Sequence, residues 1–337
     1  MIEIDGSYGE GGGQILRMSV ALSALTKKPV KVFNIRANRP NPGLKRQHMV
    51  ALESVAKIAN ARVKGLQLNS RQIEFYPGEL EGGEFKFDIG TAGSITLVLQ
   101  ACLLPSIFAK NETHLILKGG TDVKWSPPWD YFQNVIVPYL EKMGVEIETY
   151  LNKRGYYPVG GGEVEVFIKP CRKLKTIKFD GKIEGIEGIV NIANLPVSIA
   201  ERIKKSALNE LQKEGMGADI MVEETSADCS GVGIVLWTKG KILGADCLGE
   251  KGKPAEEVGK EAAIKLINEI KAGVDLDENA VDQLLPYFAL AEDNTEFKCR
   301  RISKHAETLI WLIKKFLPSV ISIGENEICK VKVEVRK

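Results

Sequence analysis

The feature that most constrains the fold is a repeated order of predicted strands and helices. Apolar residues recur three and four positions apart in the predicted helices and at every second position in the predicted strands. The first unit has a strand at 2–5, a helix at 14–26, a strand at 30–35, a helix at 45–61, and two alternating runs at 62–68 and 72–76. The segment Asn-Ser-Arg between the last two predicts a hairpin turn. The first 76 residues therefore predict a βαβαββ unit.

The same order of elements recurs twice more along the chain. The second copy has a strand at 85–89, a helix at 93–109, a strand at 113–119, a helix from SPPWDYF to Met143, and strands in VEIETYLN and EVEVFIKP. The third has a helix at 278–291, a strand in TEFKCR, a helix at 303–318 and a strand at 329–335. Weak similarity with a constant element order indicates an internal duplication.

A segment with a different order of predicted elements separates the second copy from the third. It contains predicted strands near 177–192, 218–238 and 241–247 and predicted helices near 197–214 and 254–271. We therefore expect an α/β (α+β) fold with a large domain (1–177 and 274–337) of three repeated βαβαββ units. A smaller α/β domain (178–273) is inserted into it.

Composition excludes several classes of protein. In 337 residues, 44% are hydrophobic and 27% charged, which is typical of a globular chain. No run approaches the ~18 apolar residues of a membrane span, so we expect no contact with a membrane. Acids and glycines occupy the start, where a signal peptide would need basic and apolar residues, which predicts a cytoplasmic protein. The six cysteines form no CxxC pair, which favours reduced thiols over disulfides or a zinc site.

Positive charge is concentrated in residues 27–62. This segment has a single acid, Glu53, and nine basic residues: Lys27, Lys28, Lys31, Arg36, Arg39, Lys45, Arg46, Lys57 and Arg62. The net charge is +8 there against +2 for the whole chain. A phosphate-bearing partner and a solvated lysine-rich face are both compatible with this pattern.

A glycine cluster, Gly9 to Gly13 with Glu10 embedded in it, precedes the helix that carries Arg17. Glycines at a helix start let an anion approach free backbone amides and the positive end of the helix dipole. The spacing matches neither a Walker loop nor a dinucleotide fingerprint. We favour a phosphate or metal site here over a simple turn.

Two further segments contain candidate binding residues. Arg36 and Arg39 lie in a proline-containing loop, followed by Gln47 and His48 at a helix start, and guanidinium groups suit phosphates geometrically. Few aromatic residues are interleaved, so recognition of phosphate is favoured over reading of bases. The run Gly-Thr-Ala-Gly-Ser at 90–94, followed by Gln100, fits small-residue packing between strand and helix slightly better than a binding site.

Of three histidines, His305 is the candidate nucleophile. His114 lies within a predicted strand and reads as structural. His305 begins an apolar helix beside Lys304, Arg300 and Arg301, whose charges favour a neutral imidazole that can attack a phosphorus centre. A structural role at the helix start is the alternative reading.

Taken together, these segments resemble the RNA 3'-terminal phosphate cyclase family. The resemblance covers residues 1 to about 170 and resumes near 275. It is carried by GSYGEGGGQILR (6–17), IRANRPNPGLKRQH (35–48), DIGTAGSITLVLQ (88–100), GGTDVKWSPPWDY (119–131), GYYPVGGGEV (155–164) and HAET (305–308).

The resemblance implies three βαβαββ units with a small insert and a ligase-type nucleotidyl transfer in three steps. His305 attacks the α-phosphate of ATP and forms a covalent histidine–AMP. AMP then passes to the 3'-phosphate of an RNA. The neighbouring 2'-hydroxyl finally closes a 2',3'-cyclic phosphate and releases AMP. A divalent metal, Mg²⁺ or Mn²⁺, is implied as well, and the sequence leaves open a homo-oligomer.

The resemblance also assigns roles by position. Glu10 is expected at the metal. Residues expected to bind ATP are Arg17, Gln100, Pro127, Tyr131, Asn279, Ala280, Val281, Asp282 and Gln283, with Pro127 and Tyr131 flanking the adenine. Residues expected at the RNA end or its phosphate are Arg36, Arg39, Gln47 and His48. Asn279 stands where bacterial members of the family have an aromatic residue.

Three other readings are weighed against this one. A cyclase-like protein of ribosomal RNA processing keeps the fold but lacks the histidine, which is present here at 305. An enolpyruvyl transferase is built from similar units but needs a longer chain. A non-catalytic binder of RNA ends would use the 27–62 segment without consuming ATP.

Overall fold

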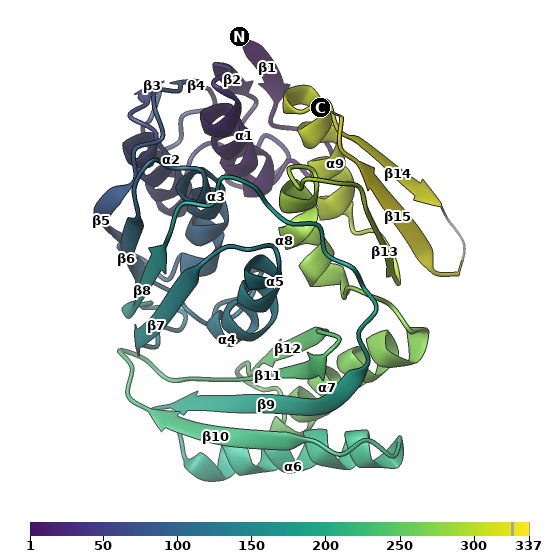
Figure 1. Ribbon diagram of the computed structural model, residues 1–337. Helices are drawn as coiled ribbons and strands as arrows, with labels where there is room; N and C mark the ends of the chain where they lie inside the picture. The colour runs from purple at the N-terminus through teal and green to yellow at the C-terminus, as the bar shows by residue number, and fades with distance from the viewer. Residues whose placement is uncertain (325–326, 337) are drawn as a thin grey trace.

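In the computed structural model, which describes residues 1–324 and 327–336, the strands form four sheets with helices packed on them (Figure 1). The predicted α/β fold is confirmed. Figure 1 shows the first two units one above the other, the third unit beside them, and the inserted segment below. No helix in the described part of the chain is long and apolar enough to span a membrane.

The first unit has the predicted element order. Its elements are β1 (Ile2–Asp5), α1 (Gly13–Thr26), β2 (Val30–Phe33), α2 (Arg46–Ile58), β3 (Arg62–Lys64) and β4 (Ile73–Tyr76). The sheet order is β1-β2-β4-β3, and α1 makes the crossover that the parallel pair β1 and β2 requires. The strand expected over 62–68 ends at Lys64, because Gly65 has a φ of +76° and turns the chain into a longer loop.

The second unit repeats this arrangement. Its elements are β5 (Gly83–Asp88), α3 (Ile95–Ile107), β6 (Thr113–Gly119), α4 (Trp129–Tyr131), the π-helical turn η1 (Phe132–Ile136), α5 (Val137–Lys142), β7 (Ile147–Lys153) and β8 (Gly162–Ile168). The sheet order, β5-β6-β8-β7, matches that of the first unit. Helix α3 packs against both α1 and α2, which explains why it is apolar on nearly all sides.

The third unit consists of α8 (Glu278–Phe288), β13 (Thr295–Cys299), α9 (Lys304–Phe316), β14 (Val320–Gly324) and β15 (Cys329–Glu334). Its order, β13-β15-β14, corresponds to the last three strands of the other units. The structure adds β14, which the sequence analysis did not predict. The third unit has no leading strand among the described residues. Before α8, only the amides of Asp275 and Leu276 donate to a neighbouring strand, both to the Lys298 carbonyl of β13, and the chain then enters the helix.

The inserted segment forms its own sheet. Its elements are β9 (Ile183–Ala193), α6 (Val197–Lys213), β10 (Asp219–Thr225), β11 (Gly231–Gly240), β12 (Gly244–Leu248) and α7 (Ala255–Ala272). The sheet order is β10-β9-β11-β12, and α6 and α7 pack against each other and the sheet. A separate apolar cluster, from Ile186 to Val274, fills this layer. The division of the chain into domains at 178 and 273 stays a prediction, and this separate core supports it.

A buried polar network joins the insert to the second unit. Arg154, 1% exposed, donates two hydrogen bonds to Asp130, one to Asp122 and two to Glu223 of β10. Asn191 of β9 donates to both Asp122 and Asp130 at 3.1 Å. Burial raises the pKa of Asp130 in spite of the guanidinium beside it. Because one guanidinium bridges acids of the second unit and of the insert, the two layers are held in one orientation by charge as well as by packing.

Candidate active site

The first turn of α9 and the N-terminal glycine loop meet at His305. The Nε2 atom of His305 lies 3.3 Å from Oε2 of Glu10, which also lies 3.6 Å from Nη2 of Arg39. All three side chains are between one-third and one-half exposed. Ser303 caps α9 by accepting a hydrogen bond from the Ala306 amide at 2.9 Å. The candidate nucleophile thus faces solvent beside the positive end of a helix.

The glycines at the start of α1 allow side chains to approach the backbone closely. A Cβ atom on Gly13 would lie 2.3 Å from Nε2 of His48 and 3.0 Å from Nη1 of Arg17. On Gly12, a Cβ atom would lie 3.3 Å from Nη2 of Arg39. The loop therefore brings three of the predicted phosphate-binding side chains to one short stretch of backbone.

His48 is neutral and has a defined tautomer. The Lys45 amide donates to its Nδ1 atom at 3.2 Å, so the ring proton belongs on Nε2, which faces Gly13. Burial, with contributions from Arg17, Arg36 and Lys45, lowers the pKa of His48 to about 3. His48 is therefore suited to donate a hydrogen bond to a phosphate oxygen rather than to contribute a charge.

Arg17 is buried without an acidic partner among the described residues. Its Nη2 donates to Oε1 of Gln100 at 3.1 Å, and its Nε finds no hydrogen-bond partner in that part of the chain. Burial lowers the pKa of Arg17 to about 10, which still leaves the guanidinium charged at neutral pH. A buried cation that lacks a counter-charge is costly, and an anionic ligand would offset that cost.

Arg36 and Gln47 partly serve the protein's own backbone. Arg36, at a φ of +54°, donates from Nη1 to the carbonyls of Asn41 at 2.6 Å and Gly43 at 3.2 Å. Oε1 of Gln47 accepts from the amide of Ser94, the residue that caps α3, at 3.0 Å. These two residues shape the loops around the site, and their predicted contacts with RNA stay predictions.

A small hollow gathers three of the predicted ATP-binding residues: Gln100, Pro127 and Gln283. Its other lining residues are Thr96, Leu103, Phe132, Ile136 and Tyr287. These five are not among the residues predicted to bind ATP. Helical spacing alone points to some of them, since Thr96 and Tyr287 each lie four positions from a glutamine on the same helix face.

The remaining predicted ATP-binding residues lie in different surroundings. Ala280 and Val281 are buried in the main apolar core, which the three units share, whereas Asn279 is exposed. Tyr131 is fully buried, and its hydroxyl donates to Asp277 at 2.5 Å. A nucleotide contact by any of these four residues stays a prediction.

Asp282 connects α8 to the start of α9. Its Oδ1 accepts from the hydroxyl of Ser303, the residue that caps α9, at 2.5 Å. Burial raises the pKa of Asp282 to about 7, with further contributions from Glu278, Asp277 and Glu10. The carboxyl group of Asp282 is thus bonded to Ser303, which lies two residues before His305 in the chain. It also holds a proton more tightly than an exposed aspartate does.

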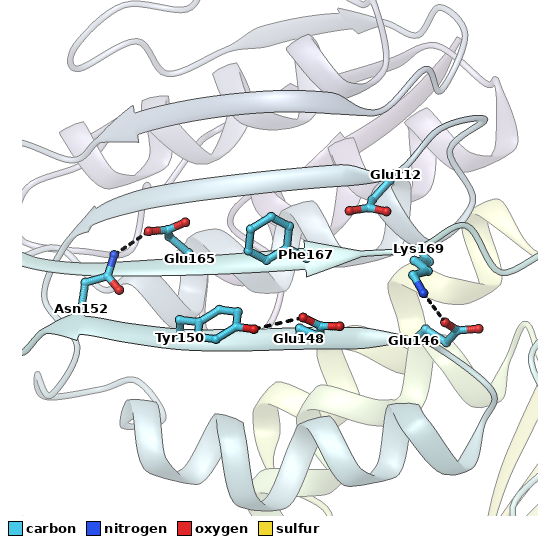
Figure 2. A pocket seen from close by; sticks show the side chains of 8 residues that line it. All are labelled: Glu112, Glu146, Glu148, Tyr150, Asn152, Glu165, Phe167 and Lys169. Atoms are coloured by element: carbon cyan, nitrogen blue, oxygen red, sulfur yellow. Dashed lines mark hydrogen bonds and ion pairs between the residues drawn. The ribbon is translucent and has the colours of Figure 1, made fainter.

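A larger hollow, of about 410 Å³, lies on the outer face of strands β6, β7 and β8 (Figure 2). Its lining residues are Glu112, Glu146, Glu148, Tyr150, Asn152, Glu165, Phe167 and Lys169. With four acids and one lysine, of which Lys169 is paired with Glu146 at 2.7 Å, the surface repels a phosphate-bearing ligand. None of the predicted site residues lines it.

Metal ligands are sparse in the described part of the chain. No group of three or more His, Cys, Asp or Glu is placed there to hold an ion. Glu10 has a partly exposed carboxylate beside the candidate nucleophile. Mg²⁺ is commonly bound by one or two carboxylates together with substrate phosphates, so Glu10 fits a metal that arrives with a nucleotide.

The chain is similar over nearly its whole length to proteins of one family. The family model described as "RNA 3'-terminal phosphate cyclase" matches residues 8–323. Proteins named RNA 3'-terminal phosphate cyclase from Pyrococcus furiosus and Methanopyrus kandleri are 48% and 46% identical to this chain, and each alignment covers 100% of this chain and 99% of the relative. A protein of the same name from Archaeoglobus fulgidus is 45% identical, over 97% of this chain and 99% of its own. The chain therefore belongs to the RNA 3'-terminal phosphate cyclase family of enzymes.

Proposed function

We propose that this protein uses ATP to convert an RNA 3'-phosphate into a 2',3'-cyclic phosphate through a covalent intermediate on His305. The observation that carries this proposal is that the side chains of His305, Glu10 and Arg39 lie together at the solvent-exposed start of α9. The names of its relatives support the substrate class.

In the first step, a ring nitrogen of His305 attacks the α-phosphorus of ATP. An N–P bond forms, the bond to the β-phosphate oxygen breaks, and pyrophosphate leaves. The imidazole must attack in its neutral form. Arg39 and the buried Arg17 supply positive charge for the phosphates, and such neutralisation contributes much of the catalysis of nucleotidyl transfer.

In the second step, an oxygen of the RNA 3'-phosphate attacks the phosphorus of the adduct, and the N–P bond breaks. In the third step, the 2'-hydroxyl loses its proton and attacks the 3'-phosphorus, and AMP leaves. Adenylylation is needed because a phosphate monoester has no adequate leaving group. We assign the handling of the RNA phosphate to Arg39 and His48, with Arg36 and Gln47 shaping the surrounding loops.

We propose that the adenine binds against Gln100, Pro127 and Gln283, the predicted ATP-binding residues that line the small hollow. A divalent metal, Mg²⁺ or Mn²⁺, supplies further neutralisation when bound, and Glu10 would hold it together with the nucleotide phosphates. All six cysteines are free thiols, as a reducing compartment permits, and we place the reaction in the cytoplasm.

The test is to incubate the protein with ATP labelled at the α-phosphate and a divalent metal, then denature it. We expect a protein-bound label that is labile in acid and stable in alkali, as a phosphoramidate is. His305→Ala should abolish the label. His114→Ala is the matched control and should keep the label, because His114 lies in the sheet of the second unit, where it stacks on Phe167 with ring centroids 4.0 Å apart.

A labelled His305→Ala variant would contradict the proposed nucleophile. Absence of label on folded wild-type protein that binds ATP and RNA ends would instead favour a non-catalytic binder.

A further inference from the structure

The N-terminal glycine loop lies along one ridge of α9. Three successive loop residues contact three helix residues spaced three apart. The pairs are Glu10 with His305, Gly9 with Thr308, and Tyr8 with Trp311. Positions three apart on a helix are neighbours, about 4.5 Å further along the axis, which is close to the spacing of successive Cα atoms. The loop and the helix are therefore in register over these three positions.

The aromatic pair forms the outer end of this contact. The rings of Tyr8 and Trp311 stack with their centroids 4.0 Å apart and an angle of 11° between their planes. Lys315 lies over the Trp311 ring at 5.5 Å. Tyr8 is 43% exposed, so the contact with Trp311 and not core burial fixes its side chain.

The middle contact leaves no room for another register. Gly9 has a φ of +56°, and a Cβ atom there would lie 2.5 Å from Oγ1 of Thr308. That hydroxyl is itself held, because it donates to the Lys304 carbonyl at 2.7 Å. A shift of the loop by one residue would bring a side chain onto Thr308.

We propose that Trp311 is a positioning residue that, by stacking on Tyr8, holds the Glu10 carboxylate against His305. The inference rests on the proposed function. Only Gly9 separates Tyr8 from Glu10, so a movement of the aromatic end is transmitted directly to the carboxylate. Without the stack, the loop keeps its own turn, in which the Gly11 amide donates to the Tyr8 carbonyl, but loses its register on α9.

The test is the rate of formation of the His305 adduct at saturating ATP. Trp311→Ala should lower this rate about tenfold, because displacement of a catalytic group by about 1 Å has effects of this order or larger. The ATP concentration for half-saturation should change less than the rate does, since the residues that line the nucleotide hollow lie on other elements. Trp311→Phe, which keeps an aromatic face, should restore most of the rate.

A double variant of Trp311 and Glu10 distinguishes a positioning role of Trp311 from a general loss of structure. If Trp311 acts through Glu10, Trp311→Ala should have little further effect in a Glu10→Gln background, so the two changes should be strongly non-additive. Tyr150→Ala, which truncates an exposed aromatic on β7, is the control and should leave the rate unchanged. Thermal unfolding should verify that each variant is folded.

Two outcomes would overturn the inference: a wild-type rate of adduct formation in Trp311→Ala, or additive effects with Glu10→Gln. A wild-type rate of adduct formation with a defect only in transfer to RNA would assign the aromatic pair to RNA contact instead. Failure of the wild-type protein to form any adduct would refute the proposed function itself, and it is distinguished by labelling the wild type first.

Discussion

At the scale of single residues, close backbone approach decides which side chains reach the site. The predicted role of the glycine cluster was contact between backbone and an anion. In the structure, the space above Gly13 is taken by His48 and Arg17. The glycine is needed so that these two side chains can face the same point, which spacing in the sequence does not reveal.

We expect Gly13→Ala to lower the free energy of unfolding by about 1–3 kcal/mol, as overpacking does, and to weaken ATP binding. Its Cβ atom would meet Nε2 of His48 at 2.3 Å and displace it. Urea denaturation measures the first effect. Gly185→Ala is the control, because nothing lies within 4 Å of a Cβ atom there. Equal unfolding free energies for Gly13→Ala and the wild type would show that the His48 side chain can move aside without loss of stability.

At the scale of elements, the third unit brings the C-terminal part of the chain against the N-terminal part. Helix α9 packs against α1 and α8, so the nucleophile on α9 faces the loop before α1. The cap of α9 depends on α8, because Ser303 donates to Asp282. The segment predicted to bind the nucleotide thus also has a structural task.

We expect the stability of the wild-type protein relative to Asp282→Asn to fall as pH rises from about 4 to 7. Burial raises the pKa of Asp282 to about 7 from an ordinary 3.8, so the native state keeps a proton that the unfolded chain releases. The stabilisation from that proton is complete below pH 3.8 and is lost as pH rises through 7.

Asparagine can still accept from Ser303 but does not titrate. The difference between the two proteins should therefore change by about 2–4 kcal/mol between pH 4 and pH 8, in favour of the variant at high pH. Urea denaturation of both proteins at these two pH values measures it. A difference that does not depend on pH would show that Asp282 titrates normally.

At the scale of the whole molecule, the buried network around Arg154 orients the insert. We expect Arg154→Met to lower the free energy of unfolding by about 3–5 kcal/mol, because it leaves buried acids without their cation. Glu223→Gln should cost much less, since the Glu223 side chain is 33% exposed and its amide can still accept from Arg154. Chemical denaturation checks both, and a near-neutral Arg154→Met would mean that packing alone holds the two layers.

Much of the fold was predictable because its signals are local. Apolar periodicity and glycine-rich turns specify the strands and helices of the first two units within short windows of sequence. The missed strand β14 is short and half-exposed, with a weak apolar pattern, and its pairing with β15 stabilises it.

The candidate site was predictable only in part. The sequence by itself determined which chemical groups are available: His305, the arginines, the glycines before α1 and the glutamines. Only the tertiary structure decided that Glu10 and His305 meet, that Arg17 is buried without an acid among the described residues, and that Ala280 and Val281 face the core. The physical reason is that secondary structure follows from neighbours in the chain, whereas the contacts of a side chain follow from the packing of elements far apart in it.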